Sequence, residues 1–307
     1  TKGDAVNYLA SGGENAAAIA RKRLPPLGIK ERTQLARGLF SRNDEREITS
    51  DLFEPISSYK DASSPTYIYL VAHEMRRRVK LSQRRVDAPL DVAHELRQIP
   101  ETIEQLLRYI FEGLEYNHGH NVVRQLFTLM ASSRAGLSAN EIADIIEVGR
   151  TSSSFLALTD DVAHLCWCYE EDGARAPEMP QDALVLRSSV VIDYVRSRYL
   201  VKDEAKNNIQ RDAMTYFLRK FSDTSGDFNV HHVLELLHFV RNGEWLVARD
   251  QFMGYITDPQ VIHFLWKQRY INELVLSWKI ATATQVSDVV QRTPMESILT
   301  RLGRMND

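Results

Sequence analysis

Only two stretches of this 307-residue chain are convincing candidates for β-strands, and their place among helical patterns constrains the fold. They are DVAHLCWCYEEDG, which begins at Asp161, and DALVLRSS, which begins at Asp182. The loop between them, EEDGARAPEMPQ, contains the Pro and Gly residues that favour turns. The pattern therefore predicts a two-stranded ribbon in a chain that is otherwise helical.

Helical patterns stand directly ahead of this ribbon. Residues 102–116 place apolar side chains three and four residues apart, which indicates an amphipathic helix. NVVRQLFTLMASS, from Asn121, indicates a second helix with an apolar face. A third helix should follow Ser138, because Ser138 and Glu141 have the spacing of a capping box. Helix, turn, helix, helix and ribbon together predict a winged helix.

The remaining sequence also has mainly helical patterns. A helix is expected to begin at Pro65, because a proline at the first helical position loses no hydrogen bond. Three arginines, residues 76–78, are expected at the far end of that helix, where they suit the negative pole of its dipole. After Val190, successive helical stretches of about 12–17 residues resemble a superhelical array, without one strict repeat period.

Charge and hydropathy limit the classes of function. A net charge of −3 argues against a dedicated nucleic-acid or membrane binder. No apolar run approaches the roughly 18–20 residues that cross a bilayer. The first residues also lack a signal-like apolar region. We therefore expect a cytoplasmic protein without a membrane span.

The spacing of cysteine and histidine residues opposes a metal site. In a strand, His164, Cys166 and Cys168 would share one face. His164 and Cys168 would then be roughly 13 Å apart, too far to bind one zinc ion. Buried thiols on a strand are the better interpretation. His118 and His120 belong to NHGHN, where Gly and Asn favour a turn between two helices.

The other histidines do not form a recognisable catalytic or metal motif. His231 and His232 are neighbours at the start of a helix and are expected to point apart. HEM and HEL, which begin at His73 and His94, lack the second histidine of H-E-x-x-H. No serine or cysteine sits in a nucleophile motif. The sequence thus predicts neither a metal site nor a catalytic residue.

The motif that binds nucleotide phosphates is also missing from this chain. G-x-x-x-x-G-K-[ST], whose backbone and lysine contact the phosphates, does not occur. No apolar strand ends in acidic residues that could hold Mg²⁺. This chain is therefore predicted not to be an enzyme, and no cofactor is expected within it.

Several stretches together resemble a known class of proteins. LPPLGIKERTQLARGLF, from Leu24, is similar to the start of the helical lid in signal-transduction (STAND) NTPases of the NACHT class. SPTYIYLVAHEMRR, from Ser64, resembles the next landmark of that lid, and the segment IPETIEQLLRYIFEGLE resembles the winged helix that follows. HHVLELLHFVRNGEW and LVLSWKIA resemble the helical region of the nephrocystin-type and telomerase-associated-type branch. The matching segments keep the family's order along nearly the whole chain.

The resemblance implies a mostly α fold with four regions. Residues 1–24 would be the C-terminal remnant of the NTPase core, and residues 25–95 would be the helical lid. Residues 96–200 would form the winged-helix domain with its small β-ribbon, and residues 201–307 the α-helical array or superhelical arm. The phosphate-binding motifs would lie in a longer parent protein, which would bind ATP or ADP with Mg.

The resemblance also implies two contacts with a nucleotide. In the family, the proline before the lid helix lies near the adenine, and Pro65 holds the matching position. Many members have a His-Asp pair after the second ribbon strand, and its His reaches a phosphate. Arg187 and Ser188 stand at those positions here, and arginine binds phosphate well. The alternative is structural: Pro65 only starts a helix, and Arg187 is a surface residue flanking the N-terminus of another.

Three functions remain open. The resemblance favours a regulatory or scaffolding section of a NACHT-class NTPase, with other protein chains or the missing NTPase core as partners. A winged helix can also bind nucleic acid, and RRRVKLSQRR, from Arg76, holds six basic residues. That cluster lies outside the winged helix, so nucleic acid is not expected as a partner. A structural protein of microtubules or of the cilium, without nucleotide dependence, is the third alternative.

Overall fold

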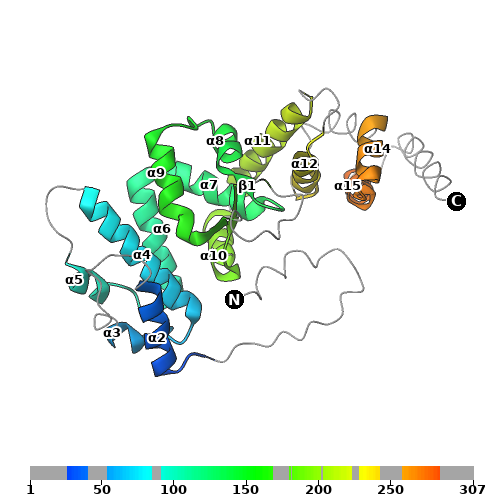
Figure 1. The fold of residues 1–307 in the computed structure, drawn as a ribbon. Helices are drawn as coiled ribbons and strands as arrows, with labels where there is room; N and C mark the ends of the chain where they lie inside the picture. Colours follow the sequence, from blue (N-terminus) through cyan, green and yellow to red (C-terminus); the bar gives the residue numbers. More distant parts are fainter. Residues whose placement is uncertain are drawn as a thin grey trace. The chain divides into compact units, whose positions relative to one another are not determined.

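The structure, a computed structural model, describes most of the predicted helices and the ribbon. The described residues are 26–40, 54–84, 91–168, 180, 182–201, 203–222, 228–242 and 258–283. Within them α-helices dominate and one small antiparallel sheet is present (Figure 1). The prediction of a mostly α fold is therefore confirmed, whereas the predicted core remnant, residues 1–24, lies outside the described part.

Contacts between residues divide the chain into two compact units. Unit 1 comprises residues 1–120, 161–165 and 187–194. Unit 2 comprises residues 121–160, 166–186 and 195–307.

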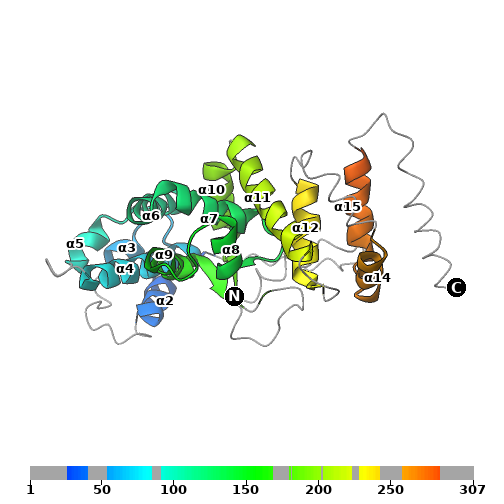
Figure 2. The ribbon, with the colours of Figure 1, turned by 90° about the horizontal axis from the view of Figure 1, so that it is seen from above.

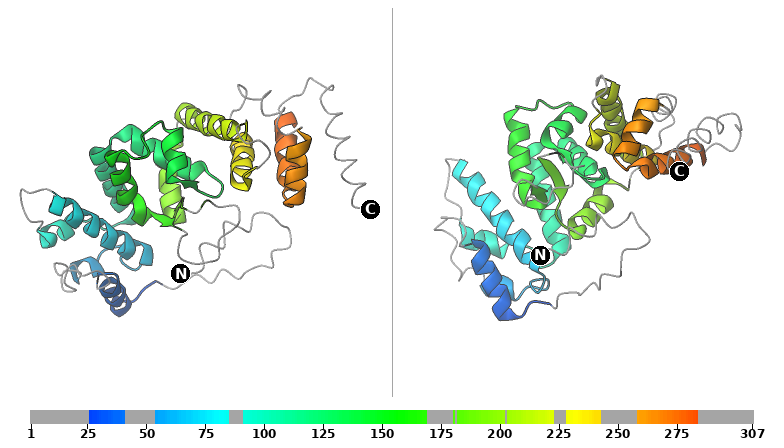
Figure 3. Two further views of the ribbon diagram at one scale, coloured as in Figure 1. Left: turned by 45° about the horizontal axis from the view of Figure 1, so that its top comes forward. Right: turned by 45° about the vertical axis from the view of Figure 1, so that its right-hand side comes forward.

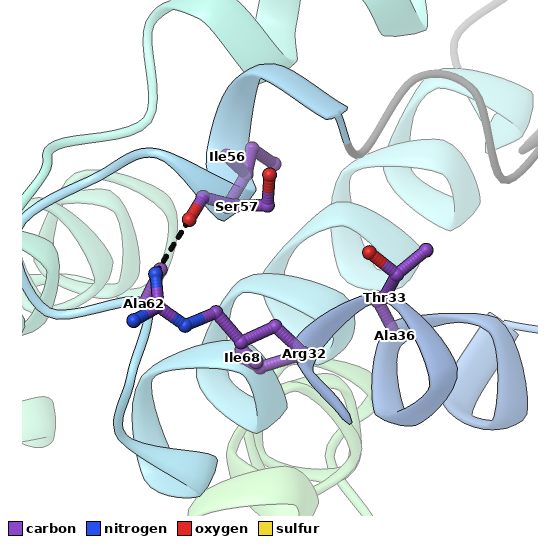
Figure 4. Close-up of a pocket in the computed structure, with 7 residues that line it drawn as sticks. All are labelled: Arg32, Thr33, Ala36, Ile56, Ser57, Ala62 and Ile68. Carbon is purple, nitrogen blue, oxygen red and sulfur yellow. Dashed lines mark hydrogen bonds between the residues drawn. The ribbon is translucent and has the colours of Figure 1, made fainter. Parts of the chain in front are cut away.

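Unit 1 is built around the long helix α4 (Pro65–Arg84), which begins at Pro65 as predicted. α2 (Ile29–Phe40) packs on α4 and on the short α3 (Glu54–Ser57). Arg32 of α2 connects α2 to α3, because its Nη1 donates to the Ser57 carbonyl at 2.7 Å (Figure 4). Its Nε donates to the Leu27 carbonyl, just ahead of α2, at 2.9 Å. α4 also contacts α5 (Val92–Arg97), α6 (Ile103–His118) and the 3₁₀ helix η2 (Ala163–Leu165).

The apolar side of α4 forms much of the core of unit 1. Tyr67 is fully buried, and its hydroxyl donates to the Pro100 carbonyl at 2.7 Å. α4 continues for six residues beyond Arg78 and ends at Arg84. The prediction that residues 76–78 occupy the last turn of this helix is therefore wrong, and a helix dipole does not account for them.

The amphipathic helix predicted at residues 102–116 is α6. Thr102 caps its N-terminus by accepting the Gln105 N–H at 3.3 Å. Gly119 ends it with a φ of 89°, a conformation that residues with a Cβ rarely adopt. The sequence pattern placed six apolar residues on one face. Ile103, in the first turn, is only half-buried, and the other five are buried: Leu106, Leu107, Ile110, Phe111 and Leu114.

Unit 2 contains the elements of a winged helix. In chain order they are α7 (His120–Ser132), β1 (Leu137–Ser138), α8 (Ala139–Ile145), α9 (Ser153–Val162), β2 (Cys166–Cys168) and β3 (Ala183–Leu186). The sheet has the order β1-β3-β2, with both pairs antiparallel. This succession of helices with a sheet in that strand order is the winged-helix topology. The sequence pattern predicted the β2–β3 ribbon but missed β1, which is only two residues long.

The corner between α7 and α8 has strict steric requirements. Gly136 has a φ of 85°, and an added Cβ there would lie 2.4 Å from Cγ2 of Val185 and 2.9 Å from the Leu184 carbonyl oxygen. The predicted capping box is confirmed: the Ser138 hydroxyl accepts the Glu141 N–H at 3.1 Å, and the Glu141 carboxylate accepts the Ser138 N–H at 2.8 Å.

The rest of unit 2 is helical. α10 (Ser189–Tyr199) spans the boundary between the units and is followed by α11 (Asp203–Ser222). α12 (Val230–Asn242) packs on α11 and on α15 (Ile271–Ala283), which also contacts α14 (Pro259–Lys267) (Figures 2 and 3). The helix expected around residues 244–256 lies outside the described residues. Among the helices that the structure describes, none is both long and apolar enough for a bilayer.

Candidate functional site

The candidate site lies on the first three turns of α4. Pro65 is the exposed first residue of the helix, and Tyr69 lies one turn further on. The Tyr69 hydroxyl donates to the His164 carbonyl of η2 at 3.3 Å. The Tyr69 ring lies 4.1 Å from the ring of His73, which in turn stacks on His164 with centroids 6.0 Å apart. Aromatic and imidazole rings therefore line this part of α4.

Arg187 joins the same cluster from the segment that follows β3. Its backbone N–H donates to the Leu165 carbonyl at 2.9 Å. Its guanidinium lies over the Tyr69 ring, 4.6 Å from the centroid, in cation–π geometry. Burial lowers the pKa of Arg187. The structure thus places the Arg187 guanidinium against Tyr69, which lies one helical turn after Pro65 on α4. Arg187 is half-buried rather than an exposed surface residue.

Ser188, beside Arg187, has a local structural role. Its hydroxyl accepts the Val190 N–H at 3.2 Å in the first turn of α10. This contact agrees with the structural alternative for the pair, in which residues 187 and 188 flank a helix N-terminus. It does not decide between the two interpretations of Arg187, whose guanidinium points instead to Tyr69.

Both histidines of the cluster are held in the neutral form. Burial lowers the pKa of His73 to about 4, and the nearby His164, Arg76 and Lys80 act in the same direction. Burial also lowers the pKa of His164 to about 4. Among the described residues, Nε2 of His164 is buried without a hydrogen-bond partner. It is a polar atom facing the interior of unit 1.

We expect these two histidines to make the stability of unit 1 depend on pH. Below about pH 6.5, the unfolded chain binds protons at His73 and His164 that the folded protein does not bind. Stability is therefore lost progressively as the pH falls from about 6.5 to about 4, with His164 alone contributing about 3 kcal/mol. Thermal unfolding measured across this range should show a flatter pH dependence for His164→Gln than for the wild type.

The matched control for this prediction is His94→Gln. His94 is exposed on α5, so its replacement should leave the pH dependence of the melting temperature as in the wild type. If the melting temperatures of His164→Gln and the wild type depended on pH to the same extent, His164 would not be the source of the lost stability at acidic pH.

A buried ion network extends from the same helix. Glu74 is fully buried and accepts from Nε and Nη2 of Arg77, both at 2.8 Å, and from Nε of Arg78 at 2.9 Å. Arg78 also pairs with Glu95 of α5 and lies over the Tyr109 ring of α6 at 4.3 Å. These contacts, rather than a helix dipole, explain two of the three arginines. The sequence pattern could have predicted these ion pairs. Glu74 stands three residues ahead of Arg77 and four ahead of Arg78, and these spacings favour ion pairs on a helix.

The network continues from Arg77 to the end of α9. Nη1 of Arg77 lies 3.8 Å from the Asp161 carboxylate, which is also 2.8 Å from Nε2 of His118. His118 is the last residue of α6 and lies next to the predicted turn at Gly119. Its contact with Asp161 gives it a second role, as part of the ion network. Gly113 of α6 leaves room for this arrangement, because an added Cβ would lie 3.1 Å from Nη2 of Arg77.

The cavity between α2, α3 and α4 is too small for a nucleotide. Its volume is about 10 Å³, roughly the space that one water needs (Figure 4). Its lining includes Arg32, Ala36, Ile56 and Ile68. A nucleotide would have to contact Pro65 and Arg187 from outside this cavity.

Within the described residues, no group of three or more potential ligands could hold a metal ion. Cys166 is a buried cysteine on a strand, as predicted, while the side chain of Cys168 lies outside the described part. The expectation that His231 and His232 point apart is wrong. Their Nε2 atoms lie 3.3 and 3.0 Å from the same Glu141 oxygen, because both long side chains turn toward α8.

Comparison with known proteins found limited similarity. Over 141 residues, or 45% of this chain, it is 26% identical to a rat (Rattus norvegicus) protein named telomerase protein component 1. The mouse (Mus musculus) protein of the same name is 27% identical over 136 residues, or 43% of the chain. Each match spans 5% of the relative's own length. No family model matches the chain, and no solved structure matches it significantly.

This similarity supports one part of the expected resemblance. The telomerase-associated branch was one of the two that the sequence suggested, and the rat and mouse proteins carry a telomerase name. Membership of the NACHT class is not shown by these matches and remains a prediction.

Proposed function

We propose that this chain is a regulatory or scaffolding section of a larger NACHT-class NTPase, in which lid and winged helix respond to a nucleotide. The observation that carries the proposal is the position of Arg187 over Tyr69, one turn from Pro65. The resemblance names Pro65 and Arg187 independently, from segments more than 100 residues apart, as nucleotide contacts. Tyr69 follows Pro65 by one turn of α4, so a position of Arg187 against Tyr69 is expected if both residues contact one ligand.

In this function the chain supplies contacts but not the chemistry of phosphate transfer. Arg187 would contact a phosphate through charge-assisted hydrogen bonds, and Pro65 would lie against the base. ATP or ADP with Mg would bind mainly to a phosphate-binding loop elsewhere in the parent protein, because this chain has no such motif. The helical array would carry the resulting change to other protein chains.

The name of the matched relatives adds support for an assembly role. Both are named as protein components of telomerase. A section of such a protein would contact other protein chains, as a scaffolding role requires.

Few features of the described residues support nucleic-acid binding or a structural role at microtubules or the cilium. α9, the helix that occupies the recognition position of a winged helix, has neither lysine nor arginine, and its exposed acidic residue is Asp160. The phosphates of a duplex would meet no cation of this helix. The basic segment that begins at Arg76 is also less available than its sequence indicates, because Arg77 and Arg78 are committed to Glu74, Glu95 and Asp161. These two arginines are therefore not available to a phosphate-rich or acidic surface.

The test has two steps, and the first is to map peptides of the native polypeptide by mass spectrometry. Sequence upstream of Thr1 with G-x-x-x-x-G-K-[ST] is expected. A native chain without that motif would overturn the proposal and leave a scaffold without nucleotide dependence.

The second step measures nucleotide affinity in that longer polypeptide. Arg187→Ala should weaken ATP binding about tenfold or more, because one charge-assisted hydrogen bond contributes about 1.5–3 kcal/mol. Arg108→Ala, at an exposed arginine of α6, is the control and should bind as the wild type does. Unchanged affinity in a folded Arg187→Ala protein would remove Arg187 from the site, and a large loss of stability would show that its role is structural.

A further inference from the structure

α12 makes two chemically different sets of contacts. Apolar contacts join it to the neighbouring helices: Phe239 stacks on Phe217 of α11 at 6.0 Å, and in addition the Leu237 carbonyl accepts from Ser277 of α15 at 3.5 Å. Polar side chains of the same helix contact the turn after α7, the end of α7 and the start of α8. These side chains are His231, His232, Glu235 and His238.

These polar side chains contact groups that end or begin other elements. Glu235 is fully buried, and its carboxylate accepts the Arg134 N–H at 3.0 Å and the Ala135 N–H at 2.7 Å, in the turn after α7. His238 Nε2 lies 2.9 Å from the carbonyl of Ser132, the last residue of α7. The terminal carbonyls of a helix and the N–H groups of a turn have no partners within their own element. α12 therefore completes the hydrogen bonding of the winged-helix corner.

The third contact acts on the capping box of α8. Glu141 caps α8 through Ser138, and the same carboxylate receives the imidazoles of His231 and His232. Although burial raises the pKa of Glu141, hydrogen bonds from these two histidines hold it well below its usual range. The cap is thus ionised and shared between α8 and α12.

Other titratable groups surround this joint. Tyr216 of α11 lies near Glu141, and Arg134 lies near Glu235. Arg241 of α12 forms an ion pair with Glu273 of α15 at 2.7 Å, within the array.

Hydrogen bonds are directional, whereas apolar packing is not. A helix held only by apolar contacts can slide or rotate at modest cost. A helix that must meet two N–H groups, one carbonyl and one carboxylate fits in a single orientation. Buried charged contacts of this kind add little net stability but are costly when one partner is lost, which suits a device that fixes geometry.

We propose that Glu141, His231, His232, Glu235 and His238 form a latch that fixes the direction in which the helical array leaves the winged helix. Through the latch, a movement of the winged helix is passed to α12 and the helices packed on it. Glu235 is the positioning residue of α12 that accepts both N–H groups of the turn after α7. This inference concerns unit 2 alone and does not depend on nucleotide binding.

The test measures the spread of a distance across the joint. Spin labels are attached at the exposed positions Ser154 on α9 and Asn272 on α15, after Ser154→Cys and Asn272→Cys in a chain with both native cysteines replaced by alanine. Double electron–electron resonance should give one narrow distance distribution. Glu235→Ala should broaden it or add a second distance, at a temperature where circular dichroism shows both proteins folded.

Two further variants complete the test. Glu235→Gln keeps the shape of the side chain and serves if Glu235→Ala does not fold; a smaller broadening is expected. Asp144→Asn, which breaks the ion pair of α8 with Arg150 outside the latch, is the matched control and should leave the distribution unchanged. A broad distribution without any substitution at the latch, or an unchanged narrow one in a folded Glu235 variant, would overturn the latch.

Discussion

Replacing Glu74 with alanine is expected to lower the free energy of unfolding of unit 1 by about 3–5 kcal/mol, because the loss of one buried partner leaves the other charges buried. Glu74 is fully buried and accepts three hydrogen bonds from Arg77 and Arg78. Arg77 is itself only 6% exposed, so it cannot turn to water. Hydrogen exchange of the α4 amides, followed in increasing denaturant, measures this change.

The control for Glu74→Ala is an exposed ion pair. Glu104 and Arg108 of α6 are 3.9 Å apart and more than half exposed, so Glu104→Ala should cost less than about 0.5 kcal/mol. If the two substitutions lowered stability equally, the network around Glu74 would not stabilise unit 1 as its geometry indicates.

Gly136→Ala is expected to have an effect of similar size in unit 2, about 2–6 kcal/mol. Two costs add at this position. A residue with a Cβ is strained at a φ of 85°, and its Cβ would lie 2.4 Å from Val185 Cγ2 and 2.9 Å from the Leu184 carbonyl oxygen. The carbonyl belongs to the backbone of β3 and cannot move without breaking the pairing of β3 with β1. Thermal unfolding by circular dichroism measures the loss.

Gly119→Ala separates the cost of backbone strain from the cost of the steric clash. Gly119 has a φ of 89°, but no heavy atom lies within 4 Å of an added Cβ. This substitution should therefore show the backbone strain alone, about 1 kcal/mol. A Gly136→Ala protein no less stable than Gly119→Ala would show that β3 adapts to the added methyl group.

Local features of this fold were predictable because they are encoded by neighbouring residues. The spacing of Leu106, Ile110 and Leu114 predicted the buried face of α6, and the pair Ser138 and Glu141 predicted the start of α8. β1 was not predictable in this way. Two residues show no alternation, and Leu137 and Ser138 form a strand only because β3 provides a partner.

Side-chain pairing across long sequence distances was the part that the sequence did not reveal. Pro65 and Arg187 were named one by one, but the contact of Arg187 with Tyr69, one turn after Pro65, depends on the fold of unit 1. The expectation for His231 and His232 considered only the angle between neighbours on a helix. It failed because a buried carboxylate, 90 residues earlier in the chain, attracts both imidazoles.

The division of the chain has a consequence for how its parts can be inherited. Along the sequence, the chain passes from one unit to the other five times, after residues 120, 160, 165, 186 and 194. Neither unit is one continuous segment, so dividing the gene at a single position would not give a piece that encodes a complete unit. The segments around the winged helix are expected to have been kept, lost or duplicated together, and a designed fragment that ends inside them would lack part of both cores.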